Sequence, residues 1–118
     1  MKKILVADDD AGIVDVMQIV LEDEGYKVIT TMSGQNVKEL CKQKPDLIFL
    51  DIWMSGADGK EICEELKADP KTKNIPVIIF SANRDTKEIA SECGAEDFIL
   101  KPFEIKELLE LARKYTSK

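Results

Sequence analysis

Short apolar segments alternate with amphipathic segments along the whole chain. The apolar segments, which we expect to be strands, are residues 3–8, 27–31, 47–50, 77–80 and 97–100. Apolar side chains at helical spacing predict helices over residues 11–24, 35–43, 60–68, 86–93 and 104–115. Because right-handed crossovers leave few other topologies, this order predicts an α/β fold: a doubly wound, five-stranded parallel sheet of (βα)5 type with helices on both faces.

Polar residues follow four of these apolar segments. Asp8 and Asp9 come after the apolar residues 4–6 of the first, Asp51 after the third, Ser81 after the fourth and Lys101 after the fifth. The carboxyl ends of parallel strands meet at one edge of a sheet, where open α/β folds bind their ligands. Three converging carboxylates repel one another and lose hydration, which is tolerable only with a divalent cation, a lysine or both among them. We therefore expect a functional site at this edge.

These residue types suit phosphoryl transfer. A glycine-containing turn follows Asp51 and leaves its carboxylate accessible as a nucleophile that forms an acyl phosphate. Asp8 and Asp9 offer the oxygen ligands that Mg²⁺ prefers, and the cation would offset the charge repulsion. Lys101 can pair with Asp51 or with an added phosphoryl oxygen, and Ser81 can donate its hydroxyl to another such oxygen.

Each of these residues taken alone also has an ordinary interpretation. Asp51 could hydrogen-bond only its own turn, and Asp8 with Asp9 could form a solvated acidic turn. Asp10 is expected to be the N-cap of the helix that follows it. Asp58 is expected to shape its turn and to start the next helix. Their common position at the ends of separate strands is what favours a site.

Composition narrows the class of protein. The 118 residues fit one domain, and the formal net charge of −6, with 17 basic residues scattered among 23 acidic ones, gives no basic footprint for direct nucleic-acid binding. Protein partners are expected instead. No apolar stretch reaches the ~20 residues of a membrane span, so we expect no membrane association and a cytoplasmic location.

Cysteine and histidine usage excludes further classes. The three cysteines, Cys41, Cys63 and Cys93, lack CxxC spacing, and the chain has no histidine. This argues against a disulfide framework and against a zinc site. We expect the cysteines to be small core or half-buried side chains in separate helices. Without histidine, any phosphoryl group must be carried by another residue.

Taken together, the segments that carry these residues resemble the receiver domain of two-component response regulators, including chemotaxis receivers. The matching segments are residues 7–10, Asp51 with 56–59, 81–82, 94–98 and 101–103. The resemblance covers essentially the whole chain in the family's order and spacing. It implies one receiver domain over residues 1–118, with strand order 2-1-3-4-5 in a flavodoxin-like three-layer sandwich.

The resemblance implies a metal-assisted phosphoacceptor. Asp51 would carry the phosphoryl group as an aspartyl phosphate. Mg²⁺, or Mn²⁺ in its place, would bind Asp8, Asp9, Asp51 and the backbone carbonyl of Trp53. The loop after the phosphoacceptor commonly has a proline in the family where this chain has Ser55, a departure that removes no reacting group.

The resemblance also implies a switch and its partners. Ser81 would follow the phosphoryl group, Lys101 would contact it, and Phe98 stands in the place of the family's aromatic switch residue. The phosphodonor would be a histidine kinase or a phosphotransfer protein, and the output would go to a downstream protein or an output domain. We expect a monomer or a weak phosphorylation-linked dimer. The only expected catalysis is self-phosphorylation and self-dephosphorylation, so the chain is not expected to be an enzyme.

Two other functions remain open at this point. A degenerate receiver could serve only as a docking scaffold, although a scaffold needs none of the converging residues. A phosphohydrolase of the haloacid-dehalogenase type would use Asp8 and Asp10, but Gly12 stands where that family has Thr or Val. That enzyme class also needs a cap domain, which this length does not provide.

Overall fold

Five parallel strands form the central sheet of the computed structural model, which describes residues 1–54 and 57–116. The strands are β1 (Lys3–Ala7), β2 (Lys27–Thr31), β3 (Leu47–Asp51), β6 (Val77–Ser81) and β7 (Asp97–Leu100). Their spatial order is β2-β1-β3-β6-β7. Counted along the chain, this is the order 2-1-3-4-5, so the predicted doubly wound topology is confirmed.

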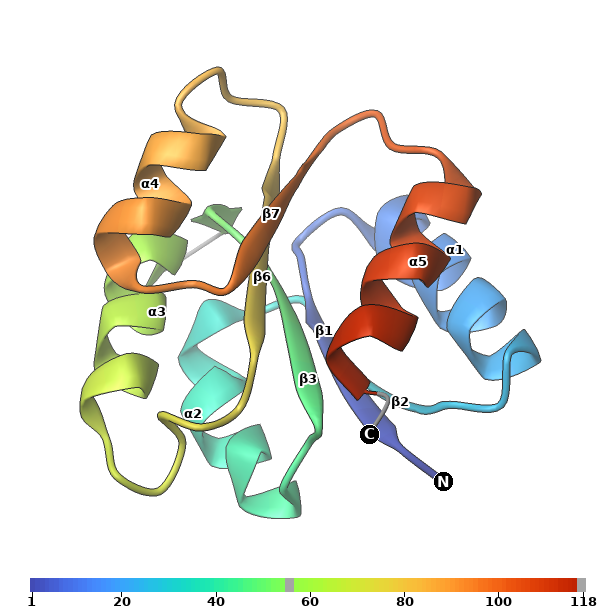
Figure 1. Cartoon of the computed structure of the whole chain (residues 1–118), viewed down its shortest axis with the longest axis horizontal. Coiled ribbons are helices and arrows are strands. Elements are labelled where there is room, and N and C mark those ends of the chain that lie inside the picture. The colour runs from blue at the N-terminus through green and yellow to red at the C-terminus, as the bar shows by residue number, and fades with distance from the viewer. Residues whose placement is uncertain (55–56, 117–118) are drawn as a thin grey trace.

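Helices cover both faces of the sheet, which confirms the three-layer architecture. The longer ones are α1 (Ala11–Asp23), α3 (Gly59–Ala68), α4 (Thr86–Cys93) and α5 (Ile105–Thr116). The helices α1 and α5 lie on one side, and α3 and α4 lie on the other with the short α2 (Val37–Leu40) (Figure 1). Within the described residues, no helix combines the length and the apolar character needed to cross a membrane.

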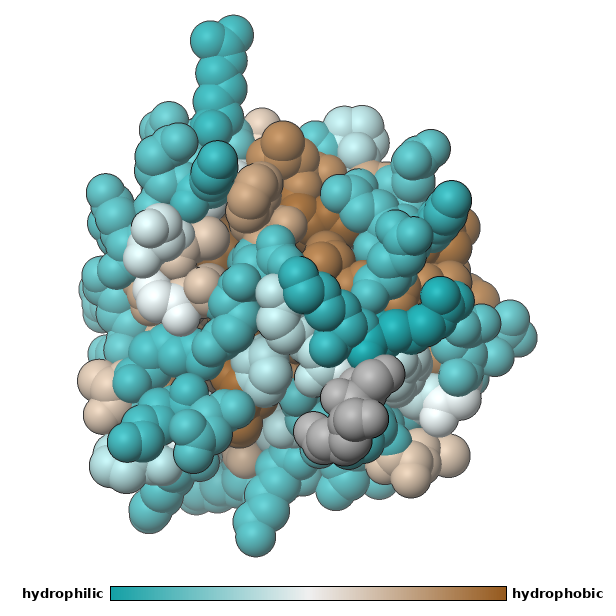
Figure 2. Space-filling view, in the orientation of Figure 1, coloured by the Kyte–Doolittle hydropathy of each residue, from teal (hydrophilic) through white to brown (hydrophobic). Residues whose placement is uncertain are grey.

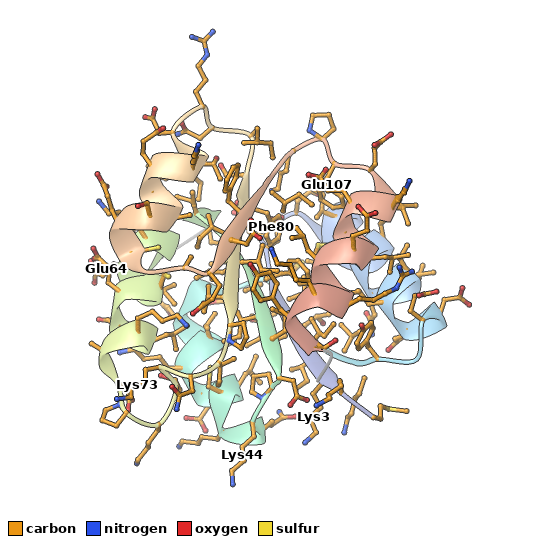
Figure 3. The ribbon with its side chains drawn as sticks, in the orientation of Figure 1. Lys3, Lys44, Glu64, Lys73, Phe80 and Glu107 are labelled. Atoms are coloured by element: carbon orange, nitrogen blue, oxygen red, sulfur yellow. The ribbon has the colours of Figure 1, made fainter. Side chains whose placement is uncertain are left out.

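Alternate residues of the strands pack into two separate hydrophobic cores, one on each face of the sheet. In β1, Leu5 belongs to the core under α3 and α4, while Ile4 and Val6 belong to the core under α1 and α5. Both sets are fully buried, as expected for strands with a helical layer on each face. Phe49 and Phe80 pack edge to face in the second core, with ring centroids 6.4 Å apart. Phe80 lies near the centre of the molecule, beside α5 (Figure 3).

Strand register aligns the residues at the carboxyl edge. Ala7 pairs with Leu50, so Asp8 and Asp51, which follow them, leave the sheet at the same level. On the other side of β3, Asp51 pairs with Phe80, and Ser81 pairs with Leu100. The predicted convergence of strand ends therefore follows from backbone pairing alone.

The second helix differs from the single helix predicted over residues 35–43. It consists of a 3₁₀ turn (Gly34–Asn36), a four-residue α2 (Val37–Leu40) and a second 3₁₀ turn (Cys41–Gln43). The Ser33 hydroxyl accepts the Gln35 N–H and so caps the first turn. Lys44 then adopts a left-handed conformation with φ 57°. The following Pro45 disfavours helical backbone in the residue before it, which explains why the helix stops there.

A small antiparallel ribbon after β3 was not predicted. It pairs β4 (Trp53–Met54) with β5 (Ala57–Asp58). Two-residue strands are too short to produce a period in the sequence. Ser55, which stands where the family commonly has a proline, falls outside the described residues.

Gly59 allows the ribbon to return closely past the end of β3. Its N–H donates to the Ile52 carbonyl at 2.8 Å. A Cβ at this position would overlap the Asp51 carbonyl oxygen and the Ile52 Cα, both of which are backbone atoms that cannot move aside. The backbone of Asp51 is thus fixed by the start of α3.

Replacing Gly59 with alanine should lower the free energy of unfolding by about 1–3 kcal/mol, because the new methyl group has no space beside the Asp51 backbone. Urea unfolding followed by circular dichroism measures the loss. Gly12→Ala is the matched control, since its Cβ would meet only a flexible carboxylate oxygen of Asp10, at 3.3 Å. Equal loss in the two variants would contradict the close approach at Gly59.

Candidate functional site

The residues predicted to converge do so at the carboxyl edge of the sheet. Asp8 follows β1, Asp51 ends β3, Ser81 ends β6 and Lys101 follows β7. Together with exposed Asp9 they line a cavity of about 480 Å³. The other lining residues are Asp10, Trp53, Ala82 and Asn83. The cavity therefore draws on all five strand-end residues that the sequence singled out.

Lys101 lies between two buried carboxylates. Its Nζ donates to Asp8 Oδ2 at 2.8 Å and lies 3.5 Å from Asp51 Oδ1. Asp8 is fully buried and Asp51 is 4% exposed. The expected pairing of Lys101 with Asp51 is thus the longer of its two contacts. The same Nζ lies 4.9 Å from the centroid of the Phe80 ring, so the ammonium group rests on the core.

This arrangement destabilises the ionised form of Asp51. Burial, and then the nearby charge of Asp8, raise the pKa of Asp51 from 3.8 to about 7, although Lys101 opposes the change. Because one lysine faces two carboxylates, the pair retains an excess negative charge at neutral pH. A further cation near Asp51 would be favoured for the same reason.

The three predicted acidic residues are arranged so that they could hold such a cation. Carboxylate oxygens of Asp8, Asp9 and Asp51 all lie within 4.8 Å of one another. Asp8 Oδ1 also accepts the Asp10 N–H at 2.9 Å, which fixes the orientation of its carboxylate. A small hard ion such as Mg²⁺ suits oxygen donors at this spacing. Trp53 lines the same cavity, and its side chain is 59% exposed.

Ser81 is held by the backbone on two sides. Its Oγ accepts the Asn83 N–H at 3.1 Å, and its carbonyl accepts the Lys101 N–H at 2.9 Å. Sequence reasoning did not single out Asn83, which lines the cavity. Its place two residues after Ser81, beyond the end of the same strand, was the signal that could have identified it.

Phe98 lies outside the acidic cavity, on β7. It is half-buried and packs against the core under α3 and α4. Its register partner is Ile79, two residues before Ser81 on the neighbouring strand. Phe98 and Ser81 therefore belong to adjacent strands without being side by side.

The residues interpreted as ordinary structure behave as expected. The Asp10 carboxylate caps α1 by accepting the N–H groups of Gly12 and Ile13. The Asp58 carboxylate caps α3 by accepting the Lys60 N–H. All three cysteines are buried, which confirms their assignment to the core.

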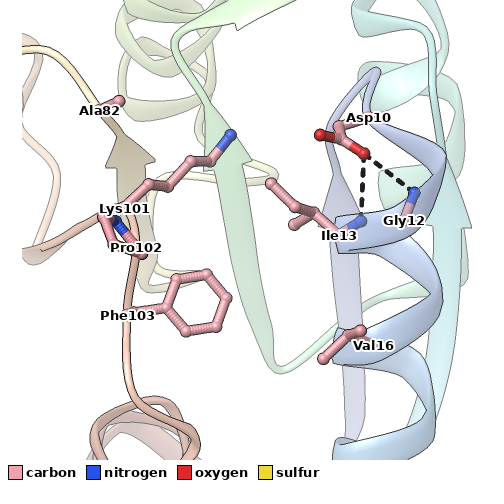
Figure 4. Close-up of a pocket in the computed structure, with 8 residues that line it drawn as sticks. All are labelled: Asp10, Gly12, Ile13, Val16, Ala82, Lys101, Pro102 and Phe103. Atoms are coloured by element: carbon pink, nitrogen blue, oxygen red, sulfur yellow. Dashed lines mark hydrogen bonds between the residues drawn. The ribbon is translucent and has the colours of Figure 1, made fainter.

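A second, more apolar cavity adjoins the acidic one (Figure 4). Its volume is about 550 Å³, and it lies between the start of α1 and the loop before α5. The lining residues are Asp10, Gly12, Ile13, Val16, Ala82, Lys101, Pro102 and Phe103. Apolar surface is also exposed between α4 and α5 (Figure 2). Lys101 forms part of the wall of both cavities, and its peptide bond to Pro102 is cis.

Because the pKa of Asp51 is raised, Asp51→Asn should increase the free energy of unfolding by an amount that depends on pH. Between pH 4 and 7 the folded state binds more protons at Asp51 than the unfolded state, so this carboxyl lowers the free energy of unfolding as pH rises. The asparagine variant should be more stable by about 2–4 kcal/mol at pH 8. The gain should shrink below pH 7 and vanish below pH 4.

Urea unfolding in EDTA across this pH range measures the difference without divalent cations. Stability curves that run parallel for the two proteins at every pH would show that Asp51 carries no such penalty.

Comparison with known proteins agrees with this geometry. The family model for the response regulator receiver domain matches residues 4–113. The DNA-binding response regulator MtrA of Mycolicibacterium paratuberculosis is 36% identical over 115 residues, which are 95% of this chain and 50% of that protein. The chain thus spans about half the length of the curated relatives it matches.

Solved structures give the same assignment. One is the signal receiver domain of a signal transduction histidine kinase from Syntrophus aciditrophicus, with TM-score 0.90 and 32% identity, covering 99% of this chain and 91% of that one. Another is the BeF3-activated N-terminal receiver domain of Klebsiella pneumoniae RstA, with TM-score 0.88 and 28% identity, covering 99% and 100%. By sequence and by structure, the chain belongs to the response regulator receiver domain family.

Proposed function

We propose that Asp51 accepts a phosphoryl group from a histidine kinase or a phosphotransfer protein, and that this modification changes the surface that a downstream partner binds. The observation that carries the proposal is the contact of Lys101 Nζ with both Asp8 and Asp51, beside exposed Asp9. A half-buried lysine between two buried carboxylates can transfer its contact to a new anion on either one.

In the proposed reaction an oxygen of Asp51 attacks the phosphorus atom, and the bond from phosphorus to the donor breaks. Asp51 must be deprotonated to attack, and a cation bound beside it would lower its pKa and so favour the nucleophilic form. Mg²⁺, or Mn²⁺, bound by Asp8, Asp9, Asp51 and the Trp53 carbonyl would neutralise charge on the phosphoryl oxygens.

The chain's own groups would hold the product. Lys101 would move its hydrogen bond from Asp8 to a phosphoryl oxygen, and the Ser81 hydroxyl would donate to another. The Ser81 hydroxyl accepts the Asn83 N–H, which leaves its own proton available for donation. A shift in the position of Ser81 would displace α4, which follows it in the chain, and Phe98 on the adjacent strand.

We infer one receiver domain over residues 1–118 with a protein or an output domain as its target. The DNA-binding function in the relatives' names belongs to proteins about twice as long. The net charge of −6 argues against direct nucleic-acid contact by this domain. A cytoplasmic location, and a monomer or weak phosphorylation-linked dimer, complete the proposal.

The two alternatives have less support. A phosphohydrolase using Asp8 and Asp10 would need the second carboxylate free, but the Asp10 side chain caps α1. A docking scaffold would not need a lysine held between two buried carboxylates, an arrangement that costs stability. Self-phosphorylation and slow self-dephosphorylation are the only catalysis we propose.

Acetyl phosphate with Mg²⁺ should add one phosphoryl group, a mass gain of about 80 Da, to the wild-type chain. EDTA should prevent the gain, since the acidic group would lose its cation. Asp51→Asn should abolish it, and intact-mass spectrometry measures it. Asp58→Asn is the matched control, because Asp58 caps α3 nearby and should leave the reaction intact. A full mass gain in Asp51→Asn would remove Asp51 from its proposed role.

Beryllofluoride, which mimics the phosphoryl group, should alter amide exchange beyond the acidic cavity mainly over residues 81–108. This segment contains Ser81, α4, Phe98 and the start of α5. Phe98→Ala should weaken coupling to the partner while leaving phosphorylation unchanged. Exchange differences centred on residues 13–40 instead would place the output surface elsewhere.

A further inference from the structure

Two ion pairs join α3 to its neighbours, one to α4 and one to the turn that follows α4. On α3, Lys60 and Lys67 lie seven residues apart and so on one face of the helix. Lys60 Nζ pairs with Glu92 at 2.8 Å, and Lys67 Nζ pairs with Glu96 at 2.8 Å. We call this contact the α3–α4 seam. The pairs fix which residues of α3 lie beside the carboxyl end of α4.

Two thiols meet in the middle of the seam. Cys63 and Cys93 are 0% and 3% exposed, and they come from positions thirty residues apart in the chain. The Cys63 thiol donates to the Cys93 carbonyl at 3.4 Å. The two thiols also interact with each other, and the Cys93 thiol donates to the Ala90 carbonyl at 3.6 Å. The proposed phosphoryl chemistry uses neither thiol.

The two thiols have different surroundings, which gives each a different role in a reaction with an oxidant. Interaction with the Cys63 thiol lowers the pKa of Cys93, although burial opposes this. The same interaction, together with burial, raises the pKa of Cys63. Cys93 also stands at the carboxyl end of α4, so it is the thiol that an oxidant reaches first, with Cys63 as its neighbour.

We propose that Cys63 and Cys93 are a redox modification site: a hydroperoxide oxidises them to a reversible disulfide that ties the carboxyl end of α4 to α3. The Cys93 thiolate attacks the peroxide, an S–O bond forms and the O–O bond breaks; the leaving oxygen takes up a proton and departs as water from hydrogen peroxide, or as an alcohol from an organic hydroperoxide. Cys63 then attacks the Cys93 sulfur. The S–S bond forms, and the hydroxyl leaves as water with the Cys63 proton.

The carboxyl end of α4 gives the oxidant its route to Cys93. Cys93 is the last residue of α4, and Gly94, with φ 84°, turns the chain immediately after it. Only Thr86, Ala90 and Cys93 of this eight-residue helix are buried. Opening of the last turn, which holds Ala90 and Cys93, would expose Cys93 at the end of the helix. The proposal does not depend on phosphorylation of Asp51.

Oxidation of the whole chain with hydrogen peroxide tests the pairing. Under native conditions the mass should fall by about 2 Da per chain, and peptide mapping after blocking free thiols should find the Cys63–Cys93 link alone. Dithiothreitol should restore the original mass. In urea, where the seam is lost, links that include Cys41 should appear as well. Native links through Cys41, or sulfinic acid on Cys93 without a link, would overturn the proposal.

Substitutions separate the two thiol roles. Cys41→Ser should keep the disulfide, since Cys41 lies outside the seam beside Lys38 and Asp69. Cys63→Ser should abolish the link and leave a sulfenic acid on Cys93 that dimedone traps. If Cys63→Ser does not fold, the wild-type peptide map alone decides the pairing.

Amide exchange tests the tether itself. Exchange over residues 86–93 should be about tenfold slower or more in the oxidised chain, because α4 can no longer open away from α3. Equal exchange in the reduced and oxidised chains would overturn the tether.

Discussion

The contact of Lys101 with Asp8 and Asp51 is the interaction on which the site depends. One ammonium group serves two buried carboxylates, so neither is fully neutralised. The sheet makes this arrangement possible because it supplies the three residues from three different strand ends. Its cost is local, and it falls on Asp51, whose carboxyl is pushed toward its protonated form. The proposed cation site and the nucleophile of the proposed reaction thus have one electrostatic origin.

The rigidity of the surrounding backbone keeps this charged group from relaxing. Register places Asp8 and Asp51 at one level, and the return of the chain at Gly59 leaves no space for the Asp51 backbone to move. The amide of Asp10 holds the other oxygen of Asp8. In a flexible loop, the two carboxylates could move apart and relieve their repulsion. Here the strands and the first turn of a helix hold them in place.

Much of this was predictable from the sequence because it depends on backbone order. Continuous apolar runs predicted β1, β3 and β6, and the residues after them predicted the cavity. The rest depends on side-chain conformation or on packing between helices. The preference of Lys101 for Asp8 over Asp51 is set by a side-chain rotamer, and the short β4–β5 ribbon has no period. The meeting of Cys63 with Cys93 depends on how α3 and α4 align, which neither helix encodes alone.

The position of Lys101 over Phe80 connects the site to the interior of the molecule. The Phe80 ring, which lies under the Lys101 ammonium group, also packs edge to face with Phe49 in the core under α1 and α5. A conservative change in core volume that tilts this ring would therefore move a charge at the surface cavity. Hydrophobic packing and the reactivity of the carboxylates are not independent traits in this chain. A substitution in the α1–α5 core that tilts Phe80 would alter the charge around Asp8 and Asp51 without removing any residue of the site.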